Sequence, residues 1–565
     1  MGGRLSTVGT MISTLPSKTE LELFKGLKSV DDIAAFLGTT FRRLSFHLYS
    51  IRRPSYRTFK IAKASGGTRL IASPPPVIAI FQKKLLQCMT EIVHPKDPCH
   101  GFSKGRSIVT NAKQHVQKHL VLNIDLLDFF PSFHFGRVRG VFQNRPFDFS
   151  PSVAAVLAQI CCFDGRLPQG GHTSPIISNL ICRGLDRDLE RLARKSKCRY
   201  TRYADDITFS TNRQEFSPNI VATIPTSSIS DLVLGTELLK IIANHDLRLN
   251  QGKTRLRHPN ERQEVTGLVT NEKVNVPRKF IRNVRAIIYN CETKGVRNEN
   301  NRFKQQMDRK QRRDQPPHLL EHLKGKLEYL RMVRGGDDHI YARLYLRAQP
   351  LSHIFSRHLT IWGGLAKPEF LAHAIWIVLG LDKDGIDISQ GTAFNLAGVG
   401  IISASHVFKN PASDGDRVAS WQLISAADHK LQYYVKNIKE IQGLDLAIVQ
   451  SPQASLRAVL CQAADEPSPR DPVTVVGFPN WNTIADELSI TTSNVSQLRT
   501  ISGVRYILTN ASIRTGNSGG PLLDSRGKVV GVALYNSESS IAPNGGIAIR
   551  HIKDLVSGVT GNSNL

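Results

Sequence analysis

The sequence predicts a multidomain protein in which an α+β part is followed by an all-β part. The chain has 565 residues, more than one hydrophobic core usually organises. Helical and strand-like patterns both occur over the first 360 residues, whereas short strand-like runs with Gly and Ser recur after residue 371. Charge divides at the same place. Residues 371–565 hold 15 basic and 16 acidic side chains, so the first 370 residues carry all of the net +27.

A strongly basic part joined to a neutral one indicates that the first part handles nucleic acid and the second does something else. The eight cysteines show no zinc-binding spacing, and only Cys461 lies beyond residue 300, so we expect a reducing compartment. No signal peptide opens the chain, and the longest apolar run is too short to cross a bilayer. We therefore expect a cytoplasmic protein without a membrane partner.

The central feature is the segment 202–210, in which Asp205 and Asp206 lie between apolar and β-branched residues. This pattern predicts two strands joined by a turn that carries both acids. Adjacent carboxylates repel each other, and a divalent metal ion is their commonest counter-charge. An isolated Asp-Asp pair is more often an acidic surface turn, so its surroundings decide the interpretation.

A second acidic segment lies upstream, where an apolar strand-like run ends at Asp125. A strand end with Asp125, beside a turn with Asp205 and Asp206, is suited to hold two Mg²⁺ ions for in-line phosphoryl transfer. We therefore predict these three acids as catalytic residues and metal ligands, with Mg²⁺ as the cofactor.

The two acidic segments resemble the palm motifs of reverse transcriptases. The resemblance implies a right-hand polymerase with fingers, palm and thumb that binds dNTPs. Segment 56–74, two strand-like runs around Gly-Gly with cations on both sides, matches the fingers hairpin. There Lys63 and Arg69 match the cations that clamp the incoming nucleotide, and a plain surface hairpin is the alternative.

Further segments make the resemblance specific to bacterial retron enzymes: His100-Gly101-Phe102, Asn111 to His115, and Val265-Thr266-Gly267. In this family Phe130 would stack under the incoming sugar and exclude a 2′-hydroxyl. Gln169, in a Leu-Pro-Gln-Gly turn that opens a helix, would bond near the nascent pair. Lys253 would protonate the departing pyrophosphate, and a surface lysine is an equal alternative. The basic residues 302–326 resemble the thumb.

Three segments of the second part carry another chemistry. His406 ends a predicted hairpin, Asp445 interrupts an apolar strand, and Ser518 lies in Gly-Asn-Ser-Gly-Gly-Pro. A serine nucleophile needs a base, and the base needs an acid to hold its tautomer. The N–H groups of Gly516 and Ser518 would form an oxyanion hole. Other acids compete for the role of Asp445, namely Asp414, Asp416 and Asp428.

The order His, Asp, Ser is that of the chymotrypsin-like double β-barrel, and this part resembles trypsin-like serine proteases. The uncharged Ser512, six positions before the nucleophile, argues against strict cleavage after Arg or Lys. We predict five segments: an N-terminal helical segment (1–55), fingers and palm (56–270), a thumb (271–360), a linker with the first protease strand (361–385), and the protease (386–565).

Together the resemblances imply a retron reverse transcriptase that copies a cognate noncoding RNA into RNA-linked single-stranded DNA (msDNA). The fused protease, acting on an unknown protein, would be an effector of anti-phage (antiviral) defence by analogy. One alternative is a protease regulated by an RNA or DNA scaffold without any need for polymerisation. Others are a mobile-intron reverse transcriptase and a protease that only releases the polymerase.

Overall fold

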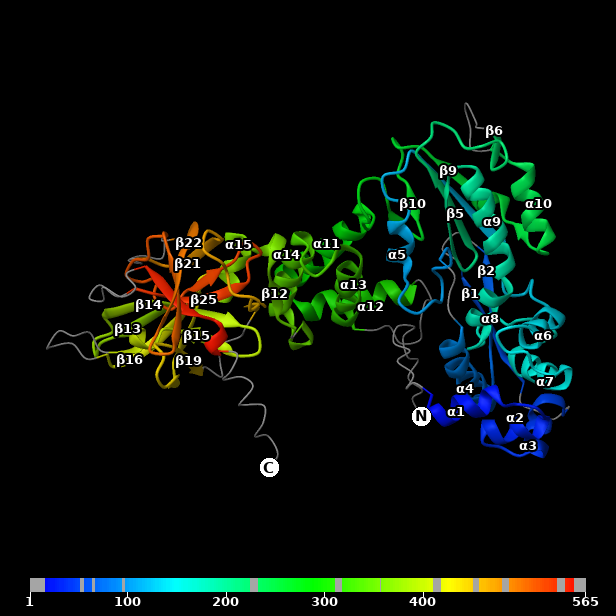
Figure 1. The fold of residues 1–565 in the computed structure, drawn as a ribbon, viewed down its shortest axis with the longest axis horizontal. Coiled ribbons are helices and arrows are strands. Elements are labelled where there is room, and N and C mark those ends of the chain that lie inside the picture. The colour runs from blue at the N-terminus through cyan, green and yellow to red at the C-terminus, as the bar shows by residue number, and fades with distance from the viewer. Residues whose placement is uncertain are drawn as a thin grey trace. The chain divides into compact units, whose positions relative to one another are not determined.

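The computed structural model describes residues 16–50, 55–62, 67–93, 97–223, 232–309, 318–355, 357–409, 418–450, 457–479, 487–535 and 544–552. The chain forms two compact units, Met1–Pro277 and Arg278–Leu565, and Figure 1 gives the element labels used below. Within the described ranges, every helix is too short or too polar to span a bilayer.

Unit 1 begins with three short helices: α1 (Lys18–Lys25), α2 (Val30–Leu37) and α3 (Phe41–Tyr49). Ser17 and Ser29 begin the first two helices as capping boxes, each exchanging hydrogen bonds with an acid three residues later. Phe24 and Phe36 are buried with ring centroids 5.5 Å apart. These helices therefore contribute to a large hydrophobic core of unit 1.

The predicted fingers hairpin is present as an antiparallel pair, β1 (Arg57–Ala62) with β2 (Thr68–Ser73). Helices then pack around the core of the unit; they are α4 (Pro76–Ile92), α5 (Ile108–Lys113), α6 (Phe135–Gln143), α7 (Pro151–Cys161), α8 (Ser174–Ile181), α9 (Arg183–Lys195) and α10 (Thr236–Asn244). On α9, Leu185, Leu189 and Leu192 recur at helical spacing and are buried.

An antiparallel sheet forms the centre of unit 1, with strand order β4-β5-β3-β8 and β9 also paired to β3. Its strands are β3 (Leu120–Leu127), β4 (Arg199–Tyr203), β5 (Asp206–Thr211), β8 (Arg248–Leu249) and β9 (Arg255–Arg257). Short elements complete the unit: β6 (Val221–Thr223), β7 (Val233–Leu234), the 3₁₀ turn η2 (Gln251–Lys253), β10 (Glu264–Val265) and β11 (Leu268–Val269).

Unit 2 opens with four helices in the predicted thumb region: α11 (Arg278–Lys294), α12 (Val296–Arg309), α13 (Leu319–Arg334) and α14 (His339–Ala348). They belong to the same compact unit as the all-β part. Tyr345 of α14 packs edge-on against Phe355, and Gln349 donates from Nε2 to the carbonyl of Arg457 at 3.1 Å. Packing therefore couples these helices to the following domain.

The connection from the helices to the sheets is folded rather than extended. It contains η3 (Gln349–Leu351), η4 (His353–Phe355), β12 (Leu359–Ile361), η5 (Gly363–Leu365), α15 (Pro368–Leu371) and η6 (Ala372–Ala374). Strand β12 pairs in parallel with β20 (Ala458–Leu460), a strand of the first sheet. The connection is therefore hydrogen-bonded to the first sheet before the chain enters the remaining strands of the all-β domain.

The first sheet runs β17-β16-β13-β14-β15-β19-β18, with β12 and β20 at its side. Its remaining strands are β13 (Ile375–Leu381), β14 (Asp387–Leu396), β15 (Gly400–Ser403), β16 (Ser420–Ser425), β17 (Asp428–Tyr434), β18 (Asn437–Glu440) and β19 (Ala447–Gln450), with η7 (Ser405–Phe408) after β15. This path is open, which differs from the closed first barrel implied by the resemblance.

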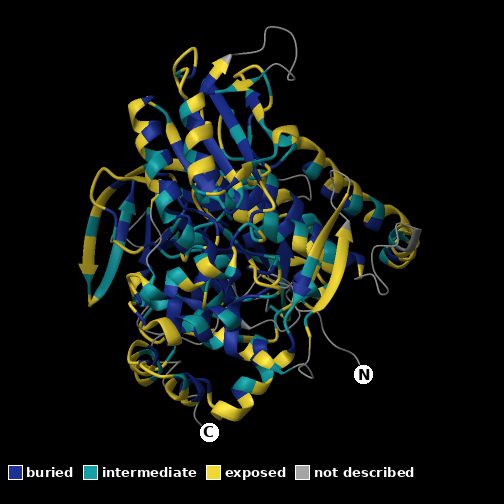
Figure 2. Cartoon of the chain, turned by 90° about the vertical axis from the view of Figure 1, so that its right-hand side faces the viewer, coloured by how far each residue is buried: buried dark blue, intermediate teal, exposed yellow. Residues whose placement is uncertain are grey.

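The second sheet is a closed barrel in the order β21-β22-β23-β26-β25-β24. Its strands are β21 (Pro472–Gly477), β22 (Ser489–Ile501), β23 (Val504–Thr509), β24 (Pro521–Leu523), β25 (Val529–Leu534) and β26 (Gly545–Ala548). Each sheet encloses its own apolar cluster. Figure 2 colours the described residues by burial, with buried residues in dark blue and exposed residues in yellow. The predicted fold class, an α+β polymerase part followed by an all-β protease-like part, is confirmed.

Candidate active sites

The central sheet of unit 1 brings the predicted carboxylates together. Strand β3 pairs with β5 so that Asp125 lies opposite Asp206. Asp205 occupies the turn between β4 and β5, and its carbonyl accepts a hydrogen bond from Leu126 N–H at 3.0 Å. Ala204, just before it, has φ of 55°, so the turn passes through the left-handed region. Residues eighty positions apart thereby lie together at one end of the paired strands β3 and β5.

The three acids influence one another electrostatically. Burial raises the pKa of Asp205, and the nearby charge of Asp125 raises it further. Removal from water raises the pKa of Asp206 to about 7, with the charges of Asp205 and Asp125 acting in the same direction. Because neighbouring negative charges and burial oppose ionisation of these carboxylates, a bound cation would stabilise their charged forms.

Asp125 already has two polar partners from the segment after β8. Lys253 donates from Nζ to Oδ1 at 2.8 Å, and Asn250 donates from Nδ2 to Oδ2 at 3.0 Å. The backbone N–H of Asn250 also donates to the Asp125 carbonyl at 2.8 Å. The sequence had singled out Lys253 but not Asn250, because an Asn-Gln-Gly-Lys turn does not by itself reveal that its asparagine contacts Asp125.

The three carboxylates suit a magnesium ion that is held partly by the protein and partly by the phosphates of a substrate. The described residues contain no group of three or more His, Cys, Asp or Glu side chains placed to enclose an ion. Mg²⁺ usually takes one or two protein carboxylates and fills its octahedron with water and phosphate oxygens. Asp125 lies opposite Asp206, and Asp205 directly precedes Asp206 in the turn, so the site offers the few carboxylates that such an ion requires.

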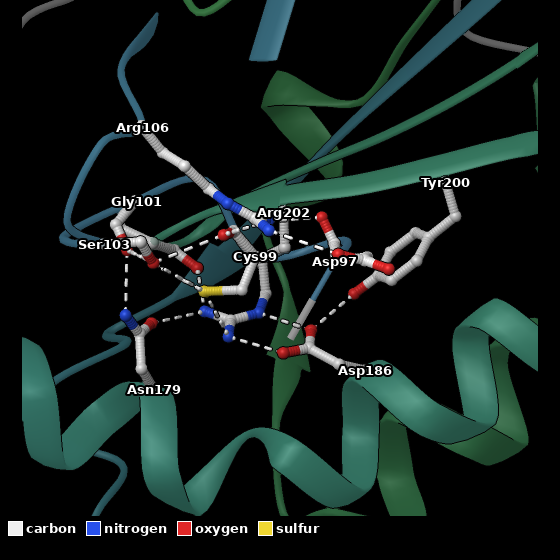
Figure 3. A network of polar contacts seen from close by, with 10 residues as sticks. Asp97, Cys99, Gly101, Ser103, Arg106, Asn179, Asp186, Tyr200 and Arg202 are labelled. Carbon is white, nitrogen blue, oxygen red and sulfur yellow. Dashed lines mark hydrogen bonds and ion pairs between the residues drawn. The ribbon is translucent and has the colours of Figure 1, made fainter. Parts of the chain in front are cut away.

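A fully buried ion pair lies beside the turn that carries Asp205 and Asp206, and Figure 3 shows its polar contacts. Arg202 donates from Nε and Nη2 to the two carboxylate oxygens of Asp186 at 2.7 and 2.8 Å, and neither side chain reaches solvent appreciably. The Nη1 group of Arg202 donates to the Ala204 carbonyl at 3.1 Å. Tyr200 donates from its hydroxyl to Asp186 at 2.8 Å. This network holds the turn immediately before Asp205.

Sequence reasoning missed Asp186 and the role of Arg202. The available signal was an arginine directly before Tyr-Ala-Asp-Asp together with an acid on the apolar side of a helix, at the position next to Leu185. Charged side chains are almost never fully buried unless they are paired, so such an acid indicates a partner. Only the fold shows that this partner is Arg202.

His115, part of the retron-like segment, is a structural residue. It is fully buried, and its ring nitrogens contact Ser210 Oγ and Thr201 Oγ1, each at 2.7 Å. Burial lowers the pKa of His115 to about 3, so the ring is neutral at physiological pH. It ties the segment after α5 to strands β4 and β5.

The predicted nucleotide-binding residues are placed as follows. Arg69 lies exposed on β2, whereas Lys63 lies outside the described residues. Phe130 is half-buried, with its ring 5.3 Å from that of the buried Phe129. The carbonyl of Gln169 accepts from Ala72 N–H at 2.9 Å, which joins the Gln169 turn to the fingers hairpin.

In the all-β domain, the predicted base and acid are in contact. His406 Nδ1 lies 2.5 Å from Asp445 Oδ2, and the His406 backbone N–H donates to Oδ1 at 2.8 Å. Ser405 donates from Oγ to the same Oδ1 at 2.8 Å. Despite partial burial, these bonds lower the pKa of Asp445 to about 2. Of the competing acids, Asp428 lies on β17, and Asp414 and Asp416 fall outside the described residues.

Ser518 lies in a turn next to the segment that precedes His406, and among the described residues no hydrogen bond joins it to His406 or Asp445. Its neighbour Gly519 has φ of 84°, and a side chain there would collide with Ser403 Oγ at 2.1 Å and with Ala404 N at 2.8 Å. The turn that carries Ser518 therefore packs directly on the segment that leads into His406. The Oγ atom of Ser518 accepts instead from Tyr535 N–H at 2.9 Å.

The predicted oxyanion hole has free donors. Among the described residues, no acceptor contacts the backbone N–H of Gly516 or of Ser518. Gly516 has φ of 91°, a region that favours glycine. Thr392, buried on β14, donates from Oγ1 to the Gly516 carbonyl at 2.6 Å, and its N–H donates to the Ser518 carbonyl at 2.9 Å. The sequence had not predicted that Thr392 positions this loop.

Two family models match parts of the chain. The family model for "Reverse transcriptase (RNA-dependent DNA polymerase)" matches residues 61–274, and that for "Trypsin-like peptidase domain" matches residues 391–532. The serine endoprotease from Yersinia pestis is similar in structure, with a TM-score of 0.27 and 18% identity over 34% of this chain and 65% of that chain.

Two curated relatives are retron enzymes. The Retron Ec86 reverse transcriptase of Escherichia coli is 33% identical over 41% of this chain and 69% of its own length. The Retron Mx162 reverse transcriptase of Myxococcus xanthus is 32% identical over 49% of this chain, and the match spans 62% of its length, less than two thirds. The chain belongs to the retron reverse transcriptase family and carries a trypsin-like peptidase domain after the polymerase segments.

Proposed function

We propose that unit 1 is an RNA-directed DNA polymerase that makes RNA-linked single-stranded DNA from a cognate noncoding RNA. The observation that carries the proposal is the meeting of Asp125, Asp205 and Asp206 at one end of the paired strands β3 and β5, in a chain of the retron family. Mg²⁺ bound there would activate the attacking hydroxyl and neutralise the leaving pyrophosphate. The dNTP substrates make the cytoplasm the proposed location.

The chain's own groups then bind and orient the nucleotide. Lys253 holds protons on Nζ, 2.8 Å from Asp125, and is the proposed proton donor to pyrophosphate. Arg69 and Lys63 of the fingers hairpin would bind the triphosphate, which arginine can contact through two parallel hydrogen bonds. Phe130 and Gln169 would contact the sugar and the nascent base pair.

The polymerase proposal is tested by DNA synthesis on a defined RNA template with labelled dNTPs. Asp205→Asn should abolish synthesis, and Asp128→Asn is the matched control because Asp128 is an exposed acid just beyond β3. Nucleic acid recovered from cells that express the chain with its upstream DNA should contain DNA whose mobility shifts after ribonuclease treatment. Synthesis retained by Asp205→Asn would contradict the assignment.

We propose that the second domain is a serine endopeptidase. Nδ1–H of His406 donates to Asp445, which leaves the Nε2 lone pair to accept the Ser518 proton. Attack requires Ser518 Oγ to leave Tyr535 N–H and turn toward His406. The N–H groups of Gly516 and Ser518 would then stabilise the oxyanion.

A fluorophosphonate probe tests this assignment because it reacts only with an activated serine. Labelling of wild type but not of Ser518→Ala is the expected result, with mass spectrometry to locate the modified residue. Equal labelling of both proteins would contradict it. The same pair of proteins run on a gel would show whether the chain cleaves itself.

We further propose that the protease is an effector in anti-phage defence and acts on a protein substrate. Its support is the union of helices α11 to α14 with the protease in one compact unit, which gives nucleic acid a route to influence proteolysis. Cells carrying wild type, Asp205→Asn or Ser518→Ala would be challenged with phage. Protection lost in Ser518→Ala supports the effector role, and protection kept in Asp205→Asn favours the scaffold alternative.

A further inference from the structure

Unit 2 contains a cavity of about 380 Å³ between helices α11 and α14. Three arginines, one histidine and two aliphatic residues line it: Arg285, Arg343, Arg347, His339, Ile340 and Leu344. Guanidinium groups that face one small volume attract an anion to the extent that neighbouring carboxylates do not already neutralise them.

The three arginines differ in how they are neutralised. Arg347 is paired with Glu292, with 2.5 Å between Nη2 and Oε2. Arg343 pairs with Glu369 at 3.2 Å, and both side chains are more than half exposed. Arg285 is exposed and has no hydrogen-bond or ion-pair partner among the described residues. The cavity therefore has one uncompensated cation and one that is only weakly held.

We propose that this cavity binds a phosphate group of a nucleic-acid backbone. A guanidinium matches phosphate through two parallel hydrogen bonds, and a site with several arginines favours phosphate over a single carboxylate. Ile340 and Leu344 reduce water access on one side, which strengthens the attraction. The volume suits one nucleotide unit and is too small for a duplex to enter. The excess positive charge of the first 370 residues makes a polyanion the favoured source of that phosphate.

The site adjoins the protease. Arg343 and Arg347 also line a neighbouring cavity of about 480 Å³, whose wall includes Glu369, Phe370 and His373 from the entry to the first sheet. A phosphate in the first cavity would compete with Glu369 for Arg343. Because that ion pair is exposed and weak, the phosphate can recruit the arginine. The ligand would thereby alter a contact between the helices and the protease domain.

The first test measures binding of a fluorescein-labelled single-stranded DNA 15-mer to the full chain by anisotropy. Arg285→Gln should weaken binding at least about 5-fold and lower the slope of log K against log salt by about 0.7, the value for one phosphate contact on a single strand. Arg282→Gln is the matched control: it removes the same charge from the same helix at an exposed residue that does not line the cavity. Equal losses in both variants, or none in Arg285→Gln, would overturn the proposal.

A second variant tests the competition for Arg343. Glu369→Gln should tighten DNA binding about 2–3-fold because the arginine is released. Glu440→Gln makes the same charge change at an exposed strand residue and should have less effect. Tightening that is equal in the two variants would show that only net charge matters and would refute the local competition.

A third measurement separates the sources of phosphate and separates this site from the polymerase. Inorganic phosphate or pyrophosphate that binds in an Arg285-dependent way, while DNA affinity is unchanged by Arg285→Gln, would overturn the nucleic-acid assignment. The inference uses the proposed function only to favour nucleic acid. In an Asp205→Asn background, Arg285→Gln should still weaken DNA binding, so failure of polymerase chemistry and failure of this site give different results.

Discussion

The buried pair between Arg202 and Asp186 gives a prediction that separates stability from catalysis. Asp186→Asn keeps the shape of the side chain but leaves the guanidinium of Arg202 buried without its counter-charge. Removing one partner of a buried pair costs about 3–5 kcal/mol. For a unit of this size each kcal/mol corresponds to about 2–4 °C, so the melting temperature of unit 1 should fall by about 6–20 °C. Glu190→Gln on the same helix breaks only an exposed pair with Arg194 and should cost about 0.3–0.5 kcal/mol.

The distribution of tryptophan makes the assay specific to one unit. All four tryptophans of the chain belong to the second unit: Trp362, Trp376, Trp421 and Trp481. Thermal unfolding followed by far-UV circular dichroism reports both units, whereas tryptophan fluorescence reports the second unit alone. Asp186→Asn should shift the dichroism transition of unit 1 and leave the fluorescence transition in place. A shift in both signals, or in neither, would refute the reasoning.

A double variant asks what Arg202 does beyond neutralising Asp186. Replacing both partners by apolar residues of similar volume, Arg202→Met with Asp186→Leu, removes the uncompensated charge and should recover most of the stability. It also removes the hydrogen bond from Arg202 to the Ala204 carbonyl, which holds the turn before Asp205. Stability should therefore return while DNA synthesis stays low. Full recovery of synthesis would show that this contact is dispensable.

Three further predictions concern both sites. Folded unit 1 keeps the Asp206 proton up to about pH 7, whereas the unfolded chain releases it near the ordinary pKa of 3.8, so the wild-type protein loses stability as the pH rises between these values. Asp206→Asn has no such proton to lose, so in the absence of divalent metal its melting temperature should exceed that of wild type by a margin that grows from pH 5 to 8. A margin that stays constant over this range would contradict the assignment. Asp445→Asn should lower protease kcat about 10⁴-fold, because His406 would then present the wrong tautomer, and a loss below 10-fold in peptide hydrolysis would argue against the triad. Thr392→Val keeps the shape but removes the hydroxyl bonded to the Gly516 carbonyl; kcat should fall with KM nearly unchanged, and a change confined to KM would contradict its positioning role.

Local patterns carried much of the interpretation. The alternation of apolar and β-branched residues around Asp205 and Asp206 indicated a strand, a turn and a strand, and the structure has β4, a turn and β5 there. The glycines around Ser518 predicted a turn in which the Gly516 and Ser518 N–H groups form an oxyanion hole, and the structure adds that Gly516 and Gly519 have positive φ. Such features follow from steric limits on a few neighbouring residues, which the sequence displays directly.

Other features depend on residues far apart in the chain, and only the tertiary structure could assign them. The partner of Arg202 is 16 positions away on a helix, and the two groups meet because α9 packs under the sheet. The Ser518 hydroxyl contacts Tyr535 N–H rather than His406, a choice of rotamer that the Gly-Asn-Ser-Gly-Gly segment leaves open.

The sequence by itself determined the two chemistries, because each needs particular residue types at short spacing: paired acids in a turn, and a serine bracketed by glycines. Tertiary structure decided how those chemistries are supported and joined. The helices expected to serve the polymerase belong to the compact unit of the protease, and three arginines from two of those helices line one cavity. The physical reason is that burial and long-range charge are properties of packed surfaces, which the order of residues along the chain does not display.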